Sequence, residues 1–149
     1  MNEIDQSQLQ FIALTCPVHN VRKVSRALTQ VFDSLFRPID LLSTQFTVLV
    51  TLGALGESVI GVLARSLGMD RTTISRELKP LIKKGFVTDW QGQDRRMRLI
   101  RLTDAGYRKL AEAIPLWEEG RQQIVELIGD ENLQLFVANL ARLNALIDG

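Results

Sequence analysis

Positively charged side chains are concentrated in one short segment of the sequence, MDRTTISRELKPLIKKGFV, which spans residues 69–87. Residues 70–109 carry eleven basic and five acidic side chains, whereas the whole chain has a net charge of only +1. Arginine, lysine and hydroxyl side chains at this density can bind phosphate groups and the edges of bases. The segment therefore predicts contact with a polyanion, although cations scattered over a solvated helix face would give the same composition.

The basic segment has the spacing of an amphipathic helix. Asp70 can cap its start, Gly85 can end it, and Pro80 is expected to bend it or thin its last turn. Four apolar residues recur at helical spacing on one face: Ile74, Leu78, Leu81 and Ile82. The residues expected to bind the polyanion project mostly from other faces: Arg71, Thr72, Thr73, Ser75, Arg76 and Lys79. Any of these six could instead be only a capping or surface residue, and Arg76 could pair with an acidic side chain such as Asp104.

The elements around this helix complete a winged helix-turn-helix. Ser58 can cap a short preceding helix that Gly68 stops, and residues 86–90 and 97–102 have the pattern of two strands joined by a polar turn. In such folds the second helix enters the major groove of double-stranded DNA, and arginine suits the negative potential of a narrow minor groove. The hairpin residues that we expect to bind DNA are Arg95, Arg96 and Arg98. The alternative is a solvated hairpin.

Long amphipathic helices are predicted on both sides of this lobe. One begins at Pro17 and ends near Phe36, and two more follow residue 103. Their apolar faces exceed what the lobe needs as cover, which usually marks an interface, here with a second copy of the chain. Helices folded back on their own lobe in a monomer are the alternative. The expected fold is mainly α with a small β-hairpin wing, in one intertwined domain. Its parts are 1–36 and 103–149 for dimerisation and 37–102 for DNA binding.

The sequence resembles the MarR (multiple-antibiotic-resistance regulator) family of winged-helix transcription factors over nearly its whole length. Two stretches carry the resemblance, LARSLGMDRTTISRELKPLIKKGFV and QDRRMRLIRLTDAG. Within the second, an Asp-x-Arg element matches Asp94 and Arg96, and LT-x-x-G matches Leu102, Thr103 and Gly106. The resemblance implies a homodimer with intertwined terminal helices, an Arg96 side chain in the minor groove, and an Asp94 that holds the wing in shape. It also implies a ligand pocket between the lobe and the dimer arms.

Cys16 is the only cysteine and precedes Pro17, where it can cap a helix whose dipole favours the thiolate. One branch of the MarR family senses organic hydroperoxides through a lone cysteine near the start of the first helix, so the resemblance makes Cys16 a candidate redox residue. That branch supports its thiol with tyrosines, whereas the only tyrosine here is Tyr107. A small buried hydrophobic residue is the alternative. One cysteine and the single histidine, His19, cannot complete a zinc site.

We expect a dimeric transcriptional regulator, a repressor that binds a pseudo-palindromic operator and is released by an apolar or aromatic small-molecule effector. An oxidant-sensing repressor acting through Cys16 and a nonspecific architectural DNA-binding protein are the alternatives. We expect no enzyme, cofactor or metal, because no nucleophile–base pair, phosphate-binding glycine loop or metal-ligand cluster is visible. No apolar run approaches the ~18 residues of a membrane span. The first residues, MNEIDQSQLQ, are unlike a secretory signal, so we expect a cytoplasmic location and no membrane partner.

Overall fold

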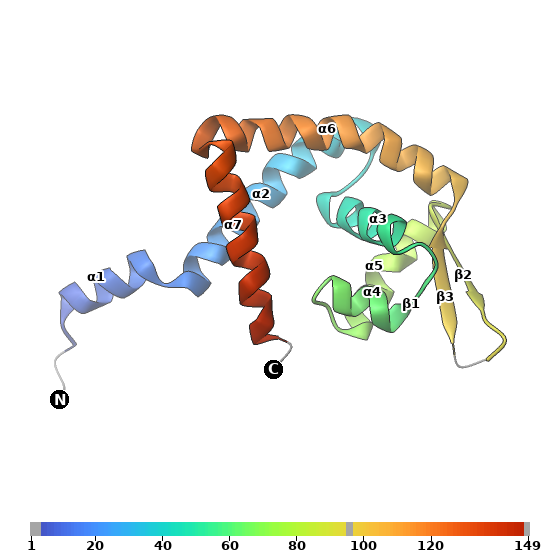
Figure 1. Cartoon of the computed structure of the whole chain (residues 1–149), viewed down its shortest axis with the longest axis horizontal. Helices are drawn as coiled ribbons and strands as arrows, with labels where there is room; N and C mark the ends of the chain where they lie inside the picture. Colours follow the sequence, from blue (N-terminus) through green and yellow to red (C-terminus); the bar gives the residue numbers. More distant parts are fainter. Residues whose placement is uncertain (1–3, 95–96, 148–149) are drawn as a thin grey trace.

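The computed structural model describes residues 4–94 and 97–147, which are mainly helical with one small sheet (Figure 1). The elements are, in chain order, α1 (Gln6–Thr15), α2 (Pro17–Phe36), the 3-10 helix η1 (Arg37–Ile39), α3 (Ser43–Leu55), β1 (Ser58–Val59), α4 (Ile60–Ser66), α5 (Arg71–Lys83), β2 (Val87–Gln91), β3 (Arg98–Leu102), α6 (Asp104–Ile128), α7 (Asp130–Leu143) and the 3-10 helix η2 (Asn144–Leu146). The expectation of a mainly helical fold with a β wing is confirmed.

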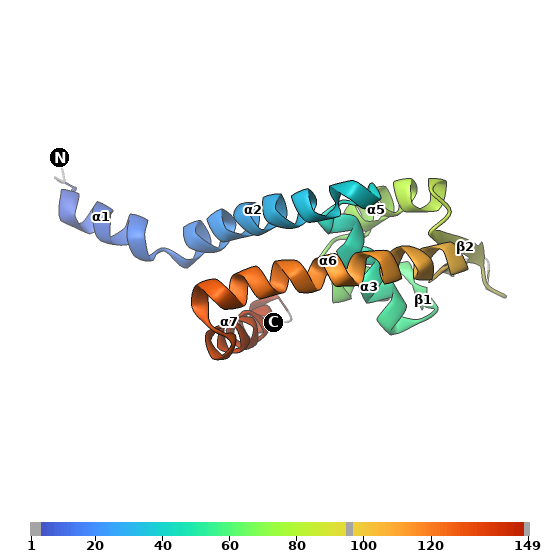
Figure 2. The same cartoon turned by 90° about the horizontal axis from the view of Figure 1, so that it is seen from above.

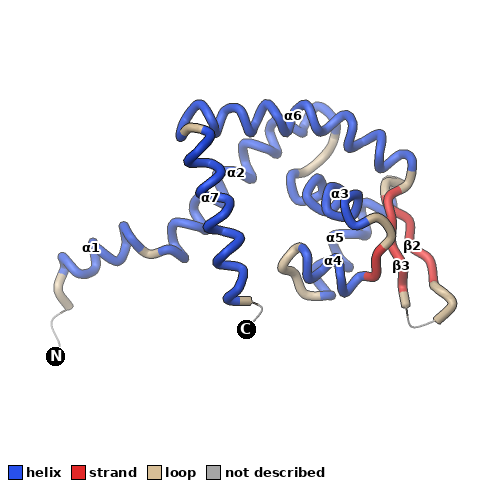
Figure 3. Tube along the Cα trace, viewed as in Figure 1, coloured by secondary structure: helices blue, strands red, loops and turns tan. Residues whose placement is uncertain are grey.

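Two long helices form a layer above a smaller lobe. α2 and α6 run side by side, and α3, α4, α5 and the sheet lie below one end of α6 (Figures 1 and 3). α6 passes directly into α7 at Gly129, whose φ of 86° lies in the left-handed region that favours glycine. α1 extends beyond the far end of α2, away from the lobe (Figure 2). The lobe and these helical arms are thus distinct parts of the chain.

The sheet has three antiparallel strands in the order β1-β3-β2. β2 and β3 form the predicted hairpin. The expectation that Ser58 caps a helix is wrong, because Ser58 lies in β1 opposite Ile100, and α4 begins only at Ile60. A two-residue strand has no periodicity of its own, and its partner strand lies far along the chain. The third strand therefore had no local signal in the sequence.

The core of the lobe surrounds α5. The predicted apolar stripe is confirmed, since Ile74, Leu78 and Leu81 are buried and Ile82 is half-buried. α5 continues to its last residue with Pro80 inside it. Fully buried side chains from the neighbouring elements pack around the stripe: Phe36, Leu49, Leu52, Leu63, Val87 and Ile100. This packing fixes the rotation of α5 about its axis and turns its opposite face to solvent.

A junction of hydrogen bonds joins the end of α5, the sheet and α6. The hydroxyl of Thr103 donates to the carbonyl oxygen of Gly85 at 2.5 Å and accepts from the backbone N–H of Gly106 at 3.1 Å. The backbone N–H of Thr103 donates to the carbonyl oxygen of Phe86 at 3.0 Å. A Cβ atom on Gly106 would overlap that same carbonyl oxygen, so the close approach requires glycine. The junction fixes the wing and α5 relative to α6.

The arms outside the lobe expose apolar side chains. No residue of α1 is buried, and its Leu9, Phe11, Ile12 and Leu14 are 45 to 77% exposed. α1 is not among the predicted helices, because its apolar residues do not gather on one face. Among the described residues no single helix is long and apolar enough to cross a bilayer; only Pro17–Ile39 and Ser43–Leu55, bent by 80° from one another, meet that limit as a pair.

Candidate nucleic-acid interface

The start of α5 is held by its own capping residue, Asp70. One carboxylate oxygen of Asp70 accepts from the backbone N–H of Thr73 at 2.7 Å, and the other accepts from the Thr73 hydroxyl at 3.0 Å. The backbone hydrogen bond from Thr73 does most to lower the pKa of the Asp70 carboxyl, followed by the hydroxyl. The Thr73 side chain therefore contributes to the cap, and the DNA contact predicted for it would compete with this bond.

The face of α5 away from the core carries exposed positive charge. Thr72, Arg76 and Lys79 are exposed on this face, and Thr73 and Ser75 are half-buried. Arg71 is also exposed, but it is the first residue of the helix and is in line with the buried Leu78 seven residues later, so it does not lie opposite the core. Within the described part of the chain no ion pair joins Arg76 to Asp104. Arg76 instead makes a small electrostatic contribution to the lowered pKa of Asp70. The cations of this face are available to an external partner.

The wing tip is only partly described. Arg95 and Arg96, the residues predicted at the tip, lie outside the described residues. Asp94 is exposed, and its carbonyl oxygen accepts a backbone hydrogen bond at 2.9 Å within the turn. The Nε of Arg98 lies 2.5 Å from Oδ2 of Asp89 on the adjacent strand. Part of the Arg98 charge is therefore compensated inside the wing, and its DNA contact stays a prediction.

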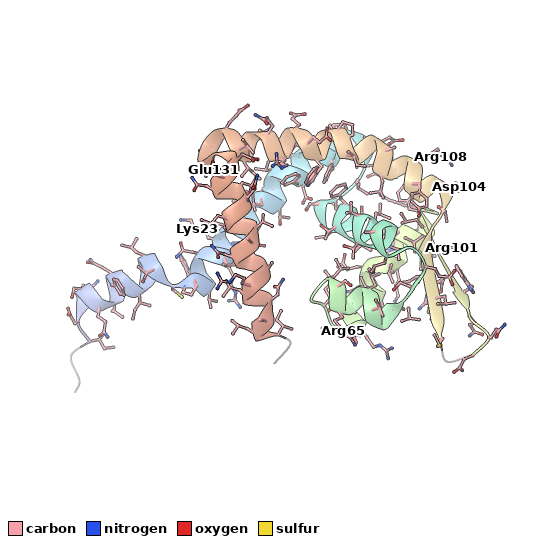
Figure 4. All side chains as sticks on the ribbon, in the orientation of Figure 1. Lys23, Arg65, Arg101, Asp104, Arg108 and Glu131 are labelled. Carbon is pink, nitrogen blue, oxygen red and sulfur yellow. The ribbon has the colours of Figure 1, made fainter. Side chains whose placement is uncertain are left out.

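Arg65 is a further basic residue near this face, and it is not among the residues predicted from the sequence to bind DNA. It is exposed on α4, at the end of the lobe away from α6 (Figure 4). Arg65 and Arg71 line one hollow of about 1030 Å³, together with Gly61 and Gly68. The sequence feature that could have predicted Arg65 is its position in the helix directly before α5. A tight turn between two helices brings the end of the first helix close to the start of the second.

Lys84 belongs to the same basic segment but is bonded within the protein. Its Nζ donates to the carbonyl oxygen of Asp40 at 2.9 Å and to the Asp40 carboxylate at 3.0 Å. Asp40 has a φ of 52° and is the only non-glycine residue with positive φ in the described ranges. The Nζ of Lys109 in α6 donates to the carbonyl oxygen of Ile39 at 3.1 Å. The two lysines hold the bend between α2 and α3, so Lys84, although exposed, is bonded within the protein and is not counted among the cations available to DNA.

An apolar pocket of about 570 Å³ lies between the arms and the lobe. Residues of α2, α3, α6 and α7 line it, with these large apolar side chains among them: Val24, Leu28, Phe32, Phe36, Phe46 and Trp117. Serine, threonine and asparagine supply its polar lining, and no charged residue is among the described lining residues. Such a pocket suits a neutral, largely apolar or aromatic molecule.

Cys16 is half-buried at the elbow between α1 and α2. It is the N-cap residue of α2, as predicted, but its side chain makes no capping hydrogen bond. The side-chain amide of Asn20 donates to the carbonyl oxygens of Leu14 and Cys16 at 3.1 and 2.9 Å, which fixes the elbow. No group of three His, Cys, Asp or Glu side chains that could hold a metal ion occurs among the residues that the structure covers.

Proteins of a known family are similar to this chain in architecture and in sequence. The sequence profile of the MarR family matches residues 41–97. The M. tuberculosis transcriptional regulator MosR, solved in complex with DNA, is 32% identical over 89% of this chain and 98% of its own, with a TM-score of 0.77. A mutant E. coli MarR complexed with operator DNA is 19% identical over 89% of this chain and 96% of its own, with a TM-score of 0.80. The HTH-type transcriptional regulator YwoH of Bacillus subtilis (strain 168) is 24% identical over 119 residues, which are 80% of this chain and 87% of YwoH. The chain therefore belongs to the MarR family of winged helix-turn-helix transcriptional regulators.

Proposed function

We propose that this chain is a dimeric repressor of transcription that binds a pseudo-palindromic operator in double-stranded DNA. The observation that carries the proposal is the exposed, positively charged face of α5, whose orientation is fixed by the buried stripe on its other side. Two relatives support it, because MosR was solved in complex with DNA and E. coli MarR with operator DNA. A protein with this role acts in the cytoplasm, where the DNA lies.

In this proposal α5 enters the major groove with its N-terminal half toward the base edges. Arg71 and Arg76 can each bind O6 and N7 of a guanine through two parallel hydrogen bonds. The hydroxyls of Thr72 and Ser75 can bind either bases or phosphates. Lys79 lies further along the same face and suits a phosphate. Each role requires only that the side chain reach solvent from α5.

The wing would lie along the neighbouring minor groove. Arg95 and Arg96 stand at its tip in the sequence, and a narrow minor groove attracts arginine by its negative potential. Asp94 would hold the turn in shape. Arg98 would reach the edge of the groove with those N–H groups that its bond to Asp89 leaves available, since a guanidinium has five.

A second copy of the chain is the proposed cover for the apolar arms. Large apolar side chains on α1, α2 and α7 are exposed, among them Phe11, Val18, Leu135 and Val137 at 55 to 66%. A helix of ten residues such as α1 is marginal in water without a partner. Exposed large apolar side chains in this number are typical of an interface. A two-fold dimer would read two half-sites about 10 base pairs apart, centre to centre.

The pocket between arms and lobe is the proposed effector site. It is bounded by α2, α6 and α7 of the arms and by α3 of the lobe, so its size depends on how these parts are spaced. A neutral apolar or aromatic molecule that fits one spacing better than another would shift the protein toward that spacing. Operator release follows if the favoured spacing no longer places both α5 helices in successive major grooves.

The experiment that tests the proposal is DNA binding with competitor. A labelled duplex from the promoter of the chain's own or a neighbouring gene, here called the promoter duplex, is titrated with protein in excess random DNA. We expect the promoter duplex to be retained, with an affinity that falls steeply as salt rises, and footprinting to show two related half-sites. Equal competition by random DNA would favour the nonspecific architectural alternative. Candidate aromatic effectors are then added to the same assay.

The oxidant-sensing alternative has its own test at Cys16. Peroxide converts an accessible thiolate to a sulfenic acid, which a second thiol can trap as a reversible mixed disulfide. If Cys16 is the sensor, peroxide should weaken binding of the promoter duplex by the parent and leave the Cys16→Ser variant unaffected. Unchanged binding by both proteins after peroxide treatment removes this alternative and leaves the pocket as the only proposed route of release.

A further inference from the structure

The guanidinium group of Arg71 lies against the backbone of Gly61 in the preceding helix. A Cβ atom placed on Gly61 would lie 3.3 Å from Nη2 of Arg71, 3.6 Å from Nε and 3.8 Å from Cζ. Outside its own helix and chain neighbours, the three atoms nearest to that position all belong to Arg71. The guanidinium therefore covers the spot where any other residue would carry a side chain.

The backbone at this position gives no reason for a glycine. Gly61 is the second residue of α4, and it is not among the glycines with positive φ: Gly56, Gly68, Gly85 and Gly129. Glycine within a helix is less favourable than alanine, because it loses more backbone freedom on folding. A residue that departs from local preference without a conformational need is expected at functional positions. What the missing side chain provides here is room for the Arg71 guanidinium.

We propose that Gly61 is a positioning residue for DNA recognition, an inference that rests on the proposed function. Arg71 is the first residue of α5, and a free arginine side chain samples many rotamers. Among the described residues, no ion pair joins Arg71 to its neighbour Asp70. Contact with Gly61 sets where the guanidinium lies before DNA arrives, which lowers the entropy lost on binding and fixes which base it meets.

A double-mutant cycle on Gly61 and Arg71 tests this role with the promoter duplex and random DNA as probes. In Gly61→Ala the guanidinium of Arg71 must move slightly to accommodate the methyl group. In Gly61→Leu the larger side chain would occupy the position of the guanidinium. We expect Gly61→Leu to weaken binding to the promoter duplex about tenfold, close to the effect of Arg71→Ala, because a bidentate arginine–guanine contact discriminates to this degree. In the Arg71→Ala background, Gly61→Leu should cause no further loss.

Thermal stability separates positioning from damage to the fold. Both Gly61 variants should melt at or above the temperature of the parent, since alanine and leucine are better helix formers than glycine. Val62→Ala is the matched control, because it changes helix propensity at an exposed position of the same helix and should leave promoter affinity unchanged. A protein that is more stable yet binds its DNA less well is the signature of a displaced contact.

The outcomes distinguish the two proposals. Unchanged promoter affinity in Gly61→Leu, or an equal loss in the parent and Arg71→Ala backgrounds, would overturn the positioning role and leave the proposed function standing. A parent protein that shows no preference for the promoter duplex over random DNA would overturn the proposed function, and the role of Gly61 with it.

Discussion

Replacement of Thr103 by valine removes one hydroxyl from the junction of α5, the sheet and α6, and nearly preserves the shape of the side chain. In the parent this hydroxyl donates to the carbonyl oxygen of Gly85 and accepts from the N–H of Gly106, which caps α6. Loss of a capping side chain costs about 1 kcal/mol, and loss of the hydrogen bond to the exposed Gly85 carbonyl costs up to about 1 kcal/mol more. We expect Thr103→Val to lower the free energy of unfolding by up to about 2 kcal/mol.

Urea unfolding followed by circular dichroism measures this loss, at one fixed protein concentration because the stability of the proposed dimer would depend on concentration. In thermal unfolding the melting temperature should fall by up to about 8 °C, at roughly 2 to 4 °C per kcal/mol for a chain of this length. Thr103→Ser keeps the hydroxyl and should stay within about 1 kcal/mol of the parent. A Thr103→Val protein as stable as the parent would refute the reasoning, since the junction would then hold without its side-chain hydrogen bonds.

Three further predictions concern the wing, the arms and the cap of α5. Arg96→Ala should weaken binding to the promoter duplex and reduce its salt dependence while the dimer stays intact; equal binding by variant and parent at matched salt would contradict the wing assignment. Phe11→Ser combined with Leu14→Ser should shift the mass measured by light scattering toward the monomer, because both side chains are exposed in the single chain, and Gln10→Ser should not. In Asp70→Ala, the loss of unfolding free energy should be constant at neutral pH and shrink as pH falls below 3.8, because folding lowers the pKa of this carboxyl from 3.8 and the parent loses the benefit once it is protonated. A loss that persists unchanged to about pH 2 would show that the cap acts without its charge.

Elements whose signals are local were predictable from the sequence. The apolar stripe of α5, its cap Asp70 and its terminating Gly85 all lie within or beside the helix, and the structure has the helix between those two residues. α2 begins at Pro17, as its fixed φ predicts, and ends at Phe36 before the Arg37-Pro38 pair. In both helices, periodicity and end signals agree with the packing that the fold then provides.

Contacts between segments that are distant in the chain were not predictable. Ser58 has the local features of a capping residue, and only its pairing with Ile100 makes it a strand residue. Nothing in the basic segment indicates that Lys84 bonds to Asp40, because that pair depends on how the bend after α2 meets the end of α5. The contact of Arg71 with Gly61 likewise depends on the angle at which α4 and α5 cross. The roles of the wing arginines stay predictions.

The bend between α2 and α3 connects the apolar pocket to the far end of α5. Phe36 and Phe46 stand on either side of the bend, line the pocket, and have ring centroids 4.8 Å apart. Asp40, within the bend, holds Lys84 at the C-cap of α5. If the pocket binds the effector as proposed, a ligand that separates the two rings would move the bend and, through the Asp40–Lys84 bonds, the C-terminal end of α5 within the same subunit. Two identical pockets that act independently in this way would give a noncooperative, hyperbolic dependence of operator release on ligand concentration.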